Sequence, residues 1–269
     1  MARHQARKRF GQHFLTDTHY IQQLVRSIAP ARDDLMVEIG PGQGALTRPL
    51  LDAVDHLHAV ELDRDLIDLL GRQISAQRLT VHAADALRFD FTRISDAPGR
   101  MRVVGNLPYN ISTPLMFHLI SQMHVIRDMH FMLQKEMVDR LVASPGSSDW
   151  GRLSVMIQYH CQADYLFTVP PGAFSPPPKV DSAIVRLIPH TTPPHPVQDY
   201  ALFASLVNQV FTQRRKAIRN GLKSFLTRAD IDAIGIDPGL RPDQLSLADF
   251  ATLANAASAL STTQGKDAP

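Results

Sequence analysis

Short apolar runs recur through the first part of the chain, and stretches with helical spacing of apolar side chains separate them. The first run, residues 36–40, reads MVEIG and passes into a glycine-rich turn. Four more runs of the same kind follow at residues 58–63, 80–85, 102–107 and 129–134. The segments around them favour helices at residues 17–29, 45–54, 64–75 and 112–124. Strands that alternate with helices form right-handed βαβ units, so the pattern predicts a parallel sheet.

Two further strand candidates, residues 163–169 and 182–188, come late in the chain. The proline-rich loop between them, residues 170–178, is too short for a crossover helix. We therefore expect these two strands to pair antiparallel at an edge of the sheet, which makes seven strands in all. The predicted fold class is α/β with a mostly parallel sheet.

The segment 189–196 contains four prolines and favours neither helix nor strand. Beyond it, residues 199–259 have helical spacing only, for example at Phe203, Leu206 and Val210. The pattern therefore predicts a first domain at residues 1–188, a linker at 189–198 and a small all-helical domain at 199–269.

Composition excludes several classes of protein. The 269 residues are 44% apolar, which suits an ordinary buried core, and no stretch approaches the roughly 20 apolar residues of a membrane span. The N-terminus lacks the apolar region of a signal peptide, so we expect a cytoplasmic protein without membrane contact. A single cysteine, Cys161, excludes an intramolecular disulfide, and its apolar neighbours favour a buried residue over a nucleophile. The twelve histidines lack zinc-site spacing, so no metal is expected.

Charge is uneven along the chain although the net charge is only +2. Residues 1–16 carry four cations and no acid, and residues 211–228 carry six cations and no acid. Two basic segments at opposite ends of the chain indicate a polyanionic partner such as nucleic acid. The alternative is a solvated basic helix face. The candidate phosphate contacts are Arg7, Lys8, Arg9, Arg214, Arg215, Lys216 and Arg219.

A glycine motif follows the first strand and places Gly40, Gly42 and Gly44 in the sequence EIGPGQG. Glycines let the backbone approach a ligand and leave amide N–H groups free to bind it. The spacing differs from the GxGxxG of a dinucleotide site, and Glu38 precedes it. A carboxylate is unfavourable beside a pyrophosphate but suits an ammonium group. S-adenosylmethionine has an ammonium group, a sulfonium and no phosphate, and it is therefore the candidate cofactor.

Two more acids stand at strand ends. Glu61 lies about 20 residues past the glycines, where a ribose hydroxyl pair is commonly held. Asp85, followed by Ala86, ends the third strand and could accept a hydrogen bond from an adenine amine. A solvated strand end or a helix cap explains each acid alone. Together with the glycine turn, they favour a nucleoside cofactor.

The fourth strand ends in the tetrapeptide Asn106-Leu107-Pro108-Tyr109. A side-chain amide oxygen can accept from an amine, a proline stiffens the loop, and a tyrosine ring can stack on a base. An ordinary strand-to-loop turn uses the same residue types. Beside the cofactor motif, the tetrapeptide favours methyl transfer to a nucleobase amine.

With these motifs the chain resembles class I S-adenosylmethionine-dependent methyltransferases. More narrowly, it resembles the bacterial family of small-subunit (16S) ribosomal RNA adenine N6,N6-dimethyltransferases. The match spans residues 3–250, and the combination of its motifs is specific. The segments that carry it are 9–15 (RFGQHFL), 38–47, 61–63, 85–86, 105–114, 129–136, 174–183 (F-x-P-x-P-K-V-x-S-A) and 211–220.

The resemblance implies a Rossmann-like domain with a seven-stranded sheet, followed by a helical RNA-binding domain. One position departs from the family, because His13 stands where the family usually has Asn. A histidine ring nitrogen can still donate or accept there. The cofactor contacts that the resemblance implies are Gln12, His13, Leu15, Glu38, Gly40, Gly42, Gly44, Glu61, Leu62, Asp85, Ala86 and Asn106.

The resemblance also implies the reaction. Two adjacent adenines near the 3′ end of small-subunit ribosomal RNA would each receive two methyl groups on N6. The Asn106 side-chain oxygen and the Leu107 carbonyl would accept the two amine hydrogens, so no strong base is needed. Tyr109 and Phe174 would stack on the two faces of the base. The expected partner is the small (30S) subunit, and the expected protein is a monomer.

Two alternatives remain open at the level of sequence. A large-subunit (23S) adenine methyltransferase of the antibiotic-resistance type shares the Asn-x-Pro-Tyr motif and a basic helical appendage. The matches at residues 111–117 and 174–183 favour the small subunit instead. The second alternative is a ribosome assembly factor for which catalysis is secondary.

Overall fold

The computed structural model describes residues 13–264 and divides the chain into two units. The first unit contains the chain up to Val138 together with Gln162–Pro189. The second contains Asp139–Cys161 together with the chain from His190 onward.

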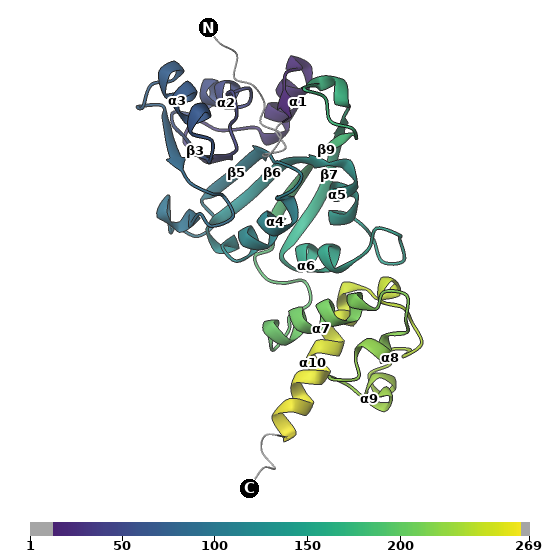
Figure 1. The fold of residues 1–269 in the computed structure, drawn as a ribbon. Coiled ribbons are helices and arrows are strands. Elements are labelled where there is room, and N and C mark those ends of the chain that lie inside the picture. The colour runs from purple at the N-terminus through teal and green to yellow at the C-terminus, as the bar shows by residue number, and fades with distance from the viewer. Residues whose placement is uncertain (1–12, 265–269) are drawn as a thin grey trace. The chain divides into compact units, whose positions relative to one another are not determined.

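Seven strands form one sheet in the order β4-β3-β2-β5-β6-β9-β7 (Figure 1). The five strands from β4 to β6 run parallel, β9 pairs antiparallel with β6, and β7 lies beside β9 at the edge. The predicted α/β class with a mostly parallel sheet is confirmed, and the two late strands are neighbours at one edge. The strands are β2 Leu35–Ile39, β3 Leu57–Glu61, β4 Leu79–Ala83, β5 Met101–Asn106, β6 Ile126–Gln134, β7 Cys161–Val169 and β9 Ser182–Pro189.

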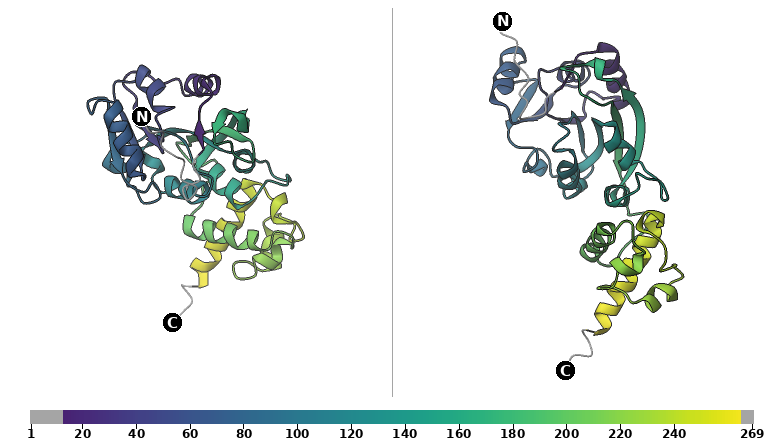
Figure 2. Two further views of the ribbon diagram at one scale, coloured as in Figure 1. Left: turned by 45° about the horizontal axis from the view of Figure 1, so that its top comes forward. Right: turned by 45° about the vertical axis from the view of Figure 1, so that its right-hand side comes forward.

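Helices cover both faces of the sheet (Figure 2). Residues of β5 and β6 are buried along almost the whole length of each strand, as expected for strands covered on both sides. The helices that follow the strands are α1 Thr18–Ile28, α2 Thr47–Ala53, α3 Arg64–Gln73, α4 Ser112–Ile120 and α5 Lys135–Leu141. Single 3-10 turns occur at Phe91–Arg93, Met123–Val125 and Pro171–Ala173.

Local sequence explains both ends of α1. The Asp17 carboxylate accepts a hydrogen bond from the His19 amide at 2.8 Å and caps the first turn. The buried side chains Ile21, Leu24 and Ile28 recur at helical spacing and form one apolar face. The helix ends at Ala29, whose φ of 47° is left-handed, and its amide donates back to the Val25 carbonyl.

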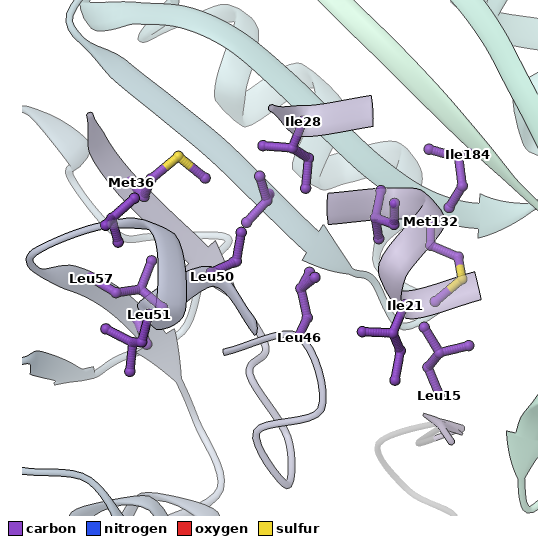
Figure 3. Close-up of a cluster of buried hydrophobic side chains, with 14 of the residues drawn as sticks. Leu15, Ile21, Ile28, Met36, Leu46, Leu50, Leu51, Leu57, Met132 and Ile184 are labelled. Atoms are coloured by element: carbon purple, nitrogen blue, oxygen red, sulfur yellow. The ribbon is translucent and has the colours of Figure 1, made fainter. Parts of the chain in front are cut away.

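The apolar face of α1 packs with α2 over the parallel strands (Figure 3). Ile28 and Leu50 from the helices join Met36 and Leu57 from β2 and β3, and all four side chains are at most 1% exposed. Each such side chain contributes about 1.5–3 kcal/mol of burial free energy. This core fixes β2 and β3 against α1 and α2.

A buried ion-pair network ties α1 to the sheet. Arg102 at the start of β5 donates to the Asp34 carboxylate at 2.6 Å and to the Asp128 carboxylate at 3.0 Å. The same guanidinium donates to the Ile28 carbonyl at 2.6 Å and so satisfies the C-terminal end of α1. These groups lie at the amino ends of the strands.

A second, two-stranded sheet pairs β1 Phe14–Leu15 antiparallel with β8 Phe174–Ser175. The amides of Thr16 and Asp17 continue this pairing by donating to the Ala173 carbonyl. Segments that are far apart in the chain therefore form one wall beside the main sheet.

The second unit is helical. Trp150 is 1% exposed, and its indole N–H donates to the Leu245 carbonyl at 2.9 Å. The Tyr159 ring lies 4.7 Å from the Phe203 ring between centroids. These contacts place residues 139–161 in the helical unit, whereas the sequence predicts an uninterrupted first domain at residues 1–188. The helices are α6 Arg152–His160, α7 Tyr200–Thr212, α8 Ile218–Gly221, α9 Arg228–Ala233 and α10 Leu247–Gln264, with a 3-10 turn at Pro242–Gln244.

Within residues 13–264, none of the helices is both long and apolar enough to cross a membrane. The same part of the chain contains no group of three or more metal-ligating side chains placed to hold a metal ion.

Candidate active site

One cavity of the first unit opens at the carboxyl ends of β2, β3 and β5, where open α/β sheets bind their ligands. Its lining includes four carboxylic side chains and, among the residues described there, no lysine or arginine. The cavity therefore favours a cationic ligand and disfavours a phosphate. The four acids are Glu38, Glu61, Asp63 and Asp85.

The glycine turn forms one side of the cavity with left-handed backbone. Gly40 has φ 67° and Gly42 has φ 57°, conformations that side chains other than glycine rarely adopt. A Cβ on Gly42 would also lie 3.1 Å from the Phe14 ring. Gly44 shares the left-handed conformation at φ 84°, but it faces Arg48 and Leu70 and does not line the cavity.

Glu38 is 2% exposed at the end of β2. Its carboxylate accepts one hydrogen bond, from the Thr47 hydroxyl at 2.6 Å. Burial raises the pKa of Glu38 to about 7, because the single hydroxyl only partly compensates the lost solvation of the anion. A cation in the cavity would stabilise the ionised form.

Glu61 ends β3 and is held by the backbone. One carboxylate oxygen accepts from the amides of Leu62 and Asp63, each at 2.9 Å, and the other accepts from the Gly42 amide at 3.4 Å. Burial raises the pKa of Glu61, and these amide hydrogen bonds oppose that rise. The carboxylate thus fixes the glycine turn to the end of β3 and keeps lone pairs for a ligand.

Leu62 and the loop after β4 form the rim. Leu62 is 54% exposed. The Asp85 carboxylate accepts from the Leu87 amide at 3.0 Å, and the buried Ala86 lies between them in the lining. An apolar surface beside a carboxylate suits the face and the amine of an adenine ring.

The tetrapeptide after β5 enters the same cavity, and Asn106, Leu107, Pro108 and Tyr109 all line it. The residue before Asn106 has no room for a side chain, because a Cβ on Gly105 would lie 2.5 Å from the Ile39 carbonyl oxygen. The Leu107 amide donates to the Met132 carbonyl of β6 at 3.1 Å. The loop is therefore anchored on the neighbouring strand.

Asn106 and Tyr109 are each fixed by a hydrogen bond. The Asn106 side-chain nitrogen donates to the His13 carbonyl at 2.8 Å. The Tyr109 hydroxyl shares a hydrogen bond of 2.7 Å with Ser182, and burial raises the pKa of Tyr109. The His13 ring stacks on the Tyr109 ring with 5.7 Å between centroids and 25° between planes.

Two predicted site residues lie differently from the rest. Phe174 is 4% exposed in the hydrophobic core and does not line the cavity, so the structure does not bring it to Tyr109. His13 does line the cavity, but its ring nitrogen Nδ1 donates to the Pro176 carbonyl at 2.8 Å. Leu15 lines the cavity as expected, with 5% of its surface exposed. The predicted contacts Gln12, Arg7, Lys8 and Arg9 lie outside the described residues.

The predicted RNA contacts of the second unit are all exposed. They follow α7 and enter α8, and none of them forms an ion pair within the described part of the chain. The Arg214 guanidinium donates to the Ser148 carbonyl. These contacts are Arg214, Arg215, Lys216 and Arg219.

Some residues that line the cavity were not predicted from the sequence. Pro41 and Gln43 stand between the glycines, and their positions in the turn could have indicated them. Ile111 and Met132 are apolar residues at an element end, and no local pattern separates them from core residues.

A family model described as ribosomal RNA adenine dimethylase matches residues 3–259. The chain belongs to this family. A relative from Alcanivorax borkumensis, named ribosomal RNA small subunit methyltransferase A, is 63% identical over 255 residues, which cover 95% of this chain and 91% of the relative.

Two solved structures share the fold over almost the whole chain. A dimethyladenosine transferase from Plasmodium falciparum has a TM-score of 0.76 at 24% identity and covers 90% of this chain and 96% of its own. The 23S ribosomal RNA methyltransferase ErmE has a TM-score of 0.70 at 26% identity and covers 91% of this chain and 99% of its own. The fold of this chain is therefore shared with a protein that is named as a 23S ribosomal RNA methyltransferase.

Proposed function

We propose that this protein transfers methyl groups from S-adenosylmethionine to N6 of two adjacent adenosines near the 3′ end of small-subunit ribosomal RNA, giving N6,N6-dimethyladenosines. One observation carries the proposal. A single cavity joins an acidic cradle, formed by Glu38 and Glu61, to the Asn106–Tyr109 loop. The cradle suits a cationic nucleoside, and the loop suits a nucleobase amine.

The residues present fit the cofactor. The buried Glu38 carboxylate favours a cationic ligand, Glu61 has free lone pairs for ribose hydroxyls, and the exposed Leu62 offers an apolar surface to adenine. Asp85 would accept from the adenine amine, and Gly40 and Gly42 would let the backbone approach. When bound, S-adenosylmethionine supplies an electrophilic methyl group on a sulfonium.

The loop would prepare the amine for attack. An exocyclic adenine amine is a poor nucleophile because its lone pair is delocalised into the ring. The Asn106 side-chain oxygen and the Leu107 carbonyl would accept its two hydrogens and draw the nitrogen toward tetrahedral geometry. Tyr109 would stack on the base, a contact worth about 1–3 kcal/mol. The proton leaves the cationic product readily, so positioning supplies most of the catalysis.

Phe174 would not stack on the adenine base, because its side chain lies in the core with 4% of its surface exposed. The exposed cations Arg214, Arg215, Lys216 and Arg219 would contact RNA phosphates outside the cavity. We expect the protein to act as a monomer on the small (30S) subunit in the cytoplasm, where subunits are assembled.

The small subunit is favoured over the large one by the relative at 63% identity, which is named for the small subunit. A role in small-subunit assembly is compatible with the same reaction. The fully formed cavity argues against an assembly factor that lacks catalysis.

The test uses purified small and large subunits that lack the modification, with methyl-labelled cofactor. We expect label on two adjacent adenosines of small-subunit RNA only. The Asn106→Ala variant should lose most of this activity while its affinity for the cofactor stays within about threefold of the parent protein. Label on large-subunit RNA, or full activity without the Asn106 amide, would overturn the proposal.

A further inference from the structure

We propose that Thr47 is a positioning residue for cofactor binding, because its hydroxyl holds the Glu38 carboxylate in place and stabilises the charge that faces the ammonium group of the cofactor. Thr47 does not line the cavity, so it acts through Glu38. The inference rests on the proposed function, which assigns this cavity to S-adenosylmethionine. It adds a residue that is not among the predicted cofactor contacts.

Thr47 and Glu38 lie on either side of the glycine turn. Glu38 stands near the end of β2, and Thr47 is the first residue of α2. Both side chains are buried, with 0% of Thr47 and 2% of Glu38 exposed. The Thr47 hydroxyl donates to Oε2 of Glu38 at 2.6 Å, within the range of about 2.5–2.7 Å that hydroxyl groups keep from charged oxygens. The geometry therefore suits an ionised carboxylate.

The second oxygen of Glu38 is left for a ligand. Within the described residues, Oε1 accepts no hydrogen bond, and the Glu38 side chain lines the cavity. Because the hydroxyl fixes Oε2, it also fixes the direction of Oε1. A buried carboxylate needs an opposite charge, and the described lining contains no lysine or arginine. A bound ammonium group would supply that charge.

The surroundings of Glu38 oppose its ionisation, apart from Thr47. Burial raises the pKa of Glu38 to about 7, repulsion by Glu61 adds to the rise, and the Thr47 hydroxyl lowers it. The strand neighbours of Glu38 are the uncharged Ala59 of β3 and Val104 of β5. From α2, the exposed Arg48 donates to the carbonyls of the glycine turn instead. The other titratable side chains of the described lining are His13, Asp63, Asp85 and Tyr109.

This arrangement couples cofactor binding to the proton of Glu38. Below pH 7 most of the cofactor-free protein carries that proton, so a cation that needs the ionised carboxylate binds more weakly as pH falls. Thr47→Val removes the hydroxyl and should raise the pKa of Glu38 further. A hydrogen bond to a charged group changes an equilibrium constant by a factor of about ten or more, so the effect is measurable.

Two variants remove the hydroxyl and two serve as comparisons. Thr47→Val keeps the shape of the side chain, and Thr47→Ala is a second variant without the hydroxyl. Thr47→Ser restores the hydroxyl. The matched control is Thr80→Val in β4, because the Thr80 hydroxyl contacts His56 at 2.9 Å and lies outside the cavity lining.

Calorimetry measures the Kd of S-adenosylmethionine for each variant at pH 6 and at pH 8.5, and urea unfolding checks that each protein is folded. The amine of the ligand titrates in this range as well. Its titration is the same for every variant, so the measured quantity is the ratio of each Kd to that of the parent protein at the same pH.

We expect Thr47→Val and Thr47→Ala to weaken the Kd at least about fivefold at pH 6, and this factor should shrink at least threefold at pH 8.5, where Glu38 is largely ionised. Thr47→Ser and Thr80→Val should stay within twofold of the parent protein at both pH values. A factor that is equal at the two pH values would overturn the inference and leave Thr47 a structural residue. A Kd at pH 6 within twofold of the parent protein would overturn it as well.

Glu38→Gln separates the effect on this carboxyl from any other. In a chain that carries Glu38→Gln, the factor caused by Thr47→Val should be the same at both pH values, because no carboxyl remains at residue 38. A pH-dependent factor in that background would overturn the inference. If the parent protein does not bind S-adenosylmethionine, the proposed function is overturned with it. If the parent protein binds the cofactor and methylates small subunits while the Thr47→Val factor is independent of pH, only the role of Thr47 is overturned.

Discussion

At the residue scale, the two glutamates of the cavity have different environments although both end a parallel strand. Glu61 accepts three backbone N–H groups, whereas Glu38 accepts one hydroxyl and is almost fully buried. Both positions could be predicted from the sequence, because an acid at a strand end beside a glycine turn is visible in the pattern. The difference between them depends on how α2 and the glycine turn cover Glu38, which no local pattern encodes.

The buried Glu38 should make the cofactor-free protein less stable as pH rises. The unfolded chain ionises this carboxyl near its ordinary pKa of 4.5, whereas the folded protein keeps the proton to a pKa of about 7. The folded state therefore binds more protons in this window, and stability falls as pH rises from about 4.5 to 7. Glu38→Gln should remove this loss and gain up to about 3 kcal/mol relative to the parent protein between pH 5 and pH 8.

Urea unfolding at pH 5 and at pH 8 measures the free energy of unfolding of Glu38→Gln and of the parent protein. The matched control is Glu136→Gln in α5, where the glutamate is exposed and the same substitution should leave the pH dependence unchanged. If Glu38→Gln and the parent protein lose stability in parallel as pH rises, burial of this carboxyl has no such effect.

His13 and Phe174 mark the limit of prediction at this scale. The stacking of His13 on Tyr109 and the burial of Phe174 both arise because β1 pairs with β8, across about 160 residues of chain. Spacing within a motif cannot indicate which of two aromatic residues enters a cavity and which enters the core.

At the element scale, the strands and helices of the first unit follow from apolar periodicity. The predicted strand at residues 102–107 is β5 at Met101–Asn106, and the predicted helix at 64–75 is α3 at Arg64–Gln73. Residues 139–161 were not predicted, because α6 is buried on most of its surface and shows no clear amphipathic period. Its place in the second unit depends on long-range contacts such as Trp150 with Leu245.

The Arg102 network should stabilise the packing of α1 on the sheet. Arg102→Met removes the cation and leaves the Asp128 carboxylate buried without this partner. Breaking one side of a buried ion pair costs about 3–5 kcal/mol. We expect a loss of this size in urea unfolding, with the cofactor Kd of the folded fraction unchanged because the network lies at the opposite strand ends.

Arg127→Met is the matched control for Arg102→Met. Arg127 contacts the same Asp34 carboxylate at 3.1 Å, but its side chain is 57% exposed. An exposed pair contributes about 0–1 kcal/mol, so this variant should be nearly as stable as the parent protein. Equal losses in the two variants would contradict the assignment of Arg102 as the buried anchor.

At the scale of the whole molecule, the first unit contains a cavity lined by carboxylates, and the second contains the exposed cations that follow α7. RNA phosphates would be repelled by the carboxylates of the cavity and attracted by these exposed cations. Under the proposed function, the carboxylates of the cavity would serve cofactor binding and these cations would serve RNA binding. The uneven charge could be predicted from the sequence, but the engagement of Arg214 with the Ser148 carbonyl could not, and it decides which cations are best suited to a test.

Reversing Arg215 and Lys216 to glutamate should weaken binding to small subunits and leave cofactor binding intact. Both side chains are exposed, and within the described residues neither forms an ion pair, so their loss should not disturb the fold. Each phosphate contact releases counterions, and losing two should reduce the slope of log K against log salt concentration by roughly 1.5 to 2.

The matched control replaces Arg72 and Arg93, two exposed cations of the first unit, with glutamate and changes the net charge equally. Binding measured at several salt concentrations separates the possibilities. If both double variants lower affinity equally, only the overall charge matters. If neither changes the slope, these cations merely solvate the helical unit. A reduced slope in the Arg215 and Lys216 variant alone places the RNA contact on that segment.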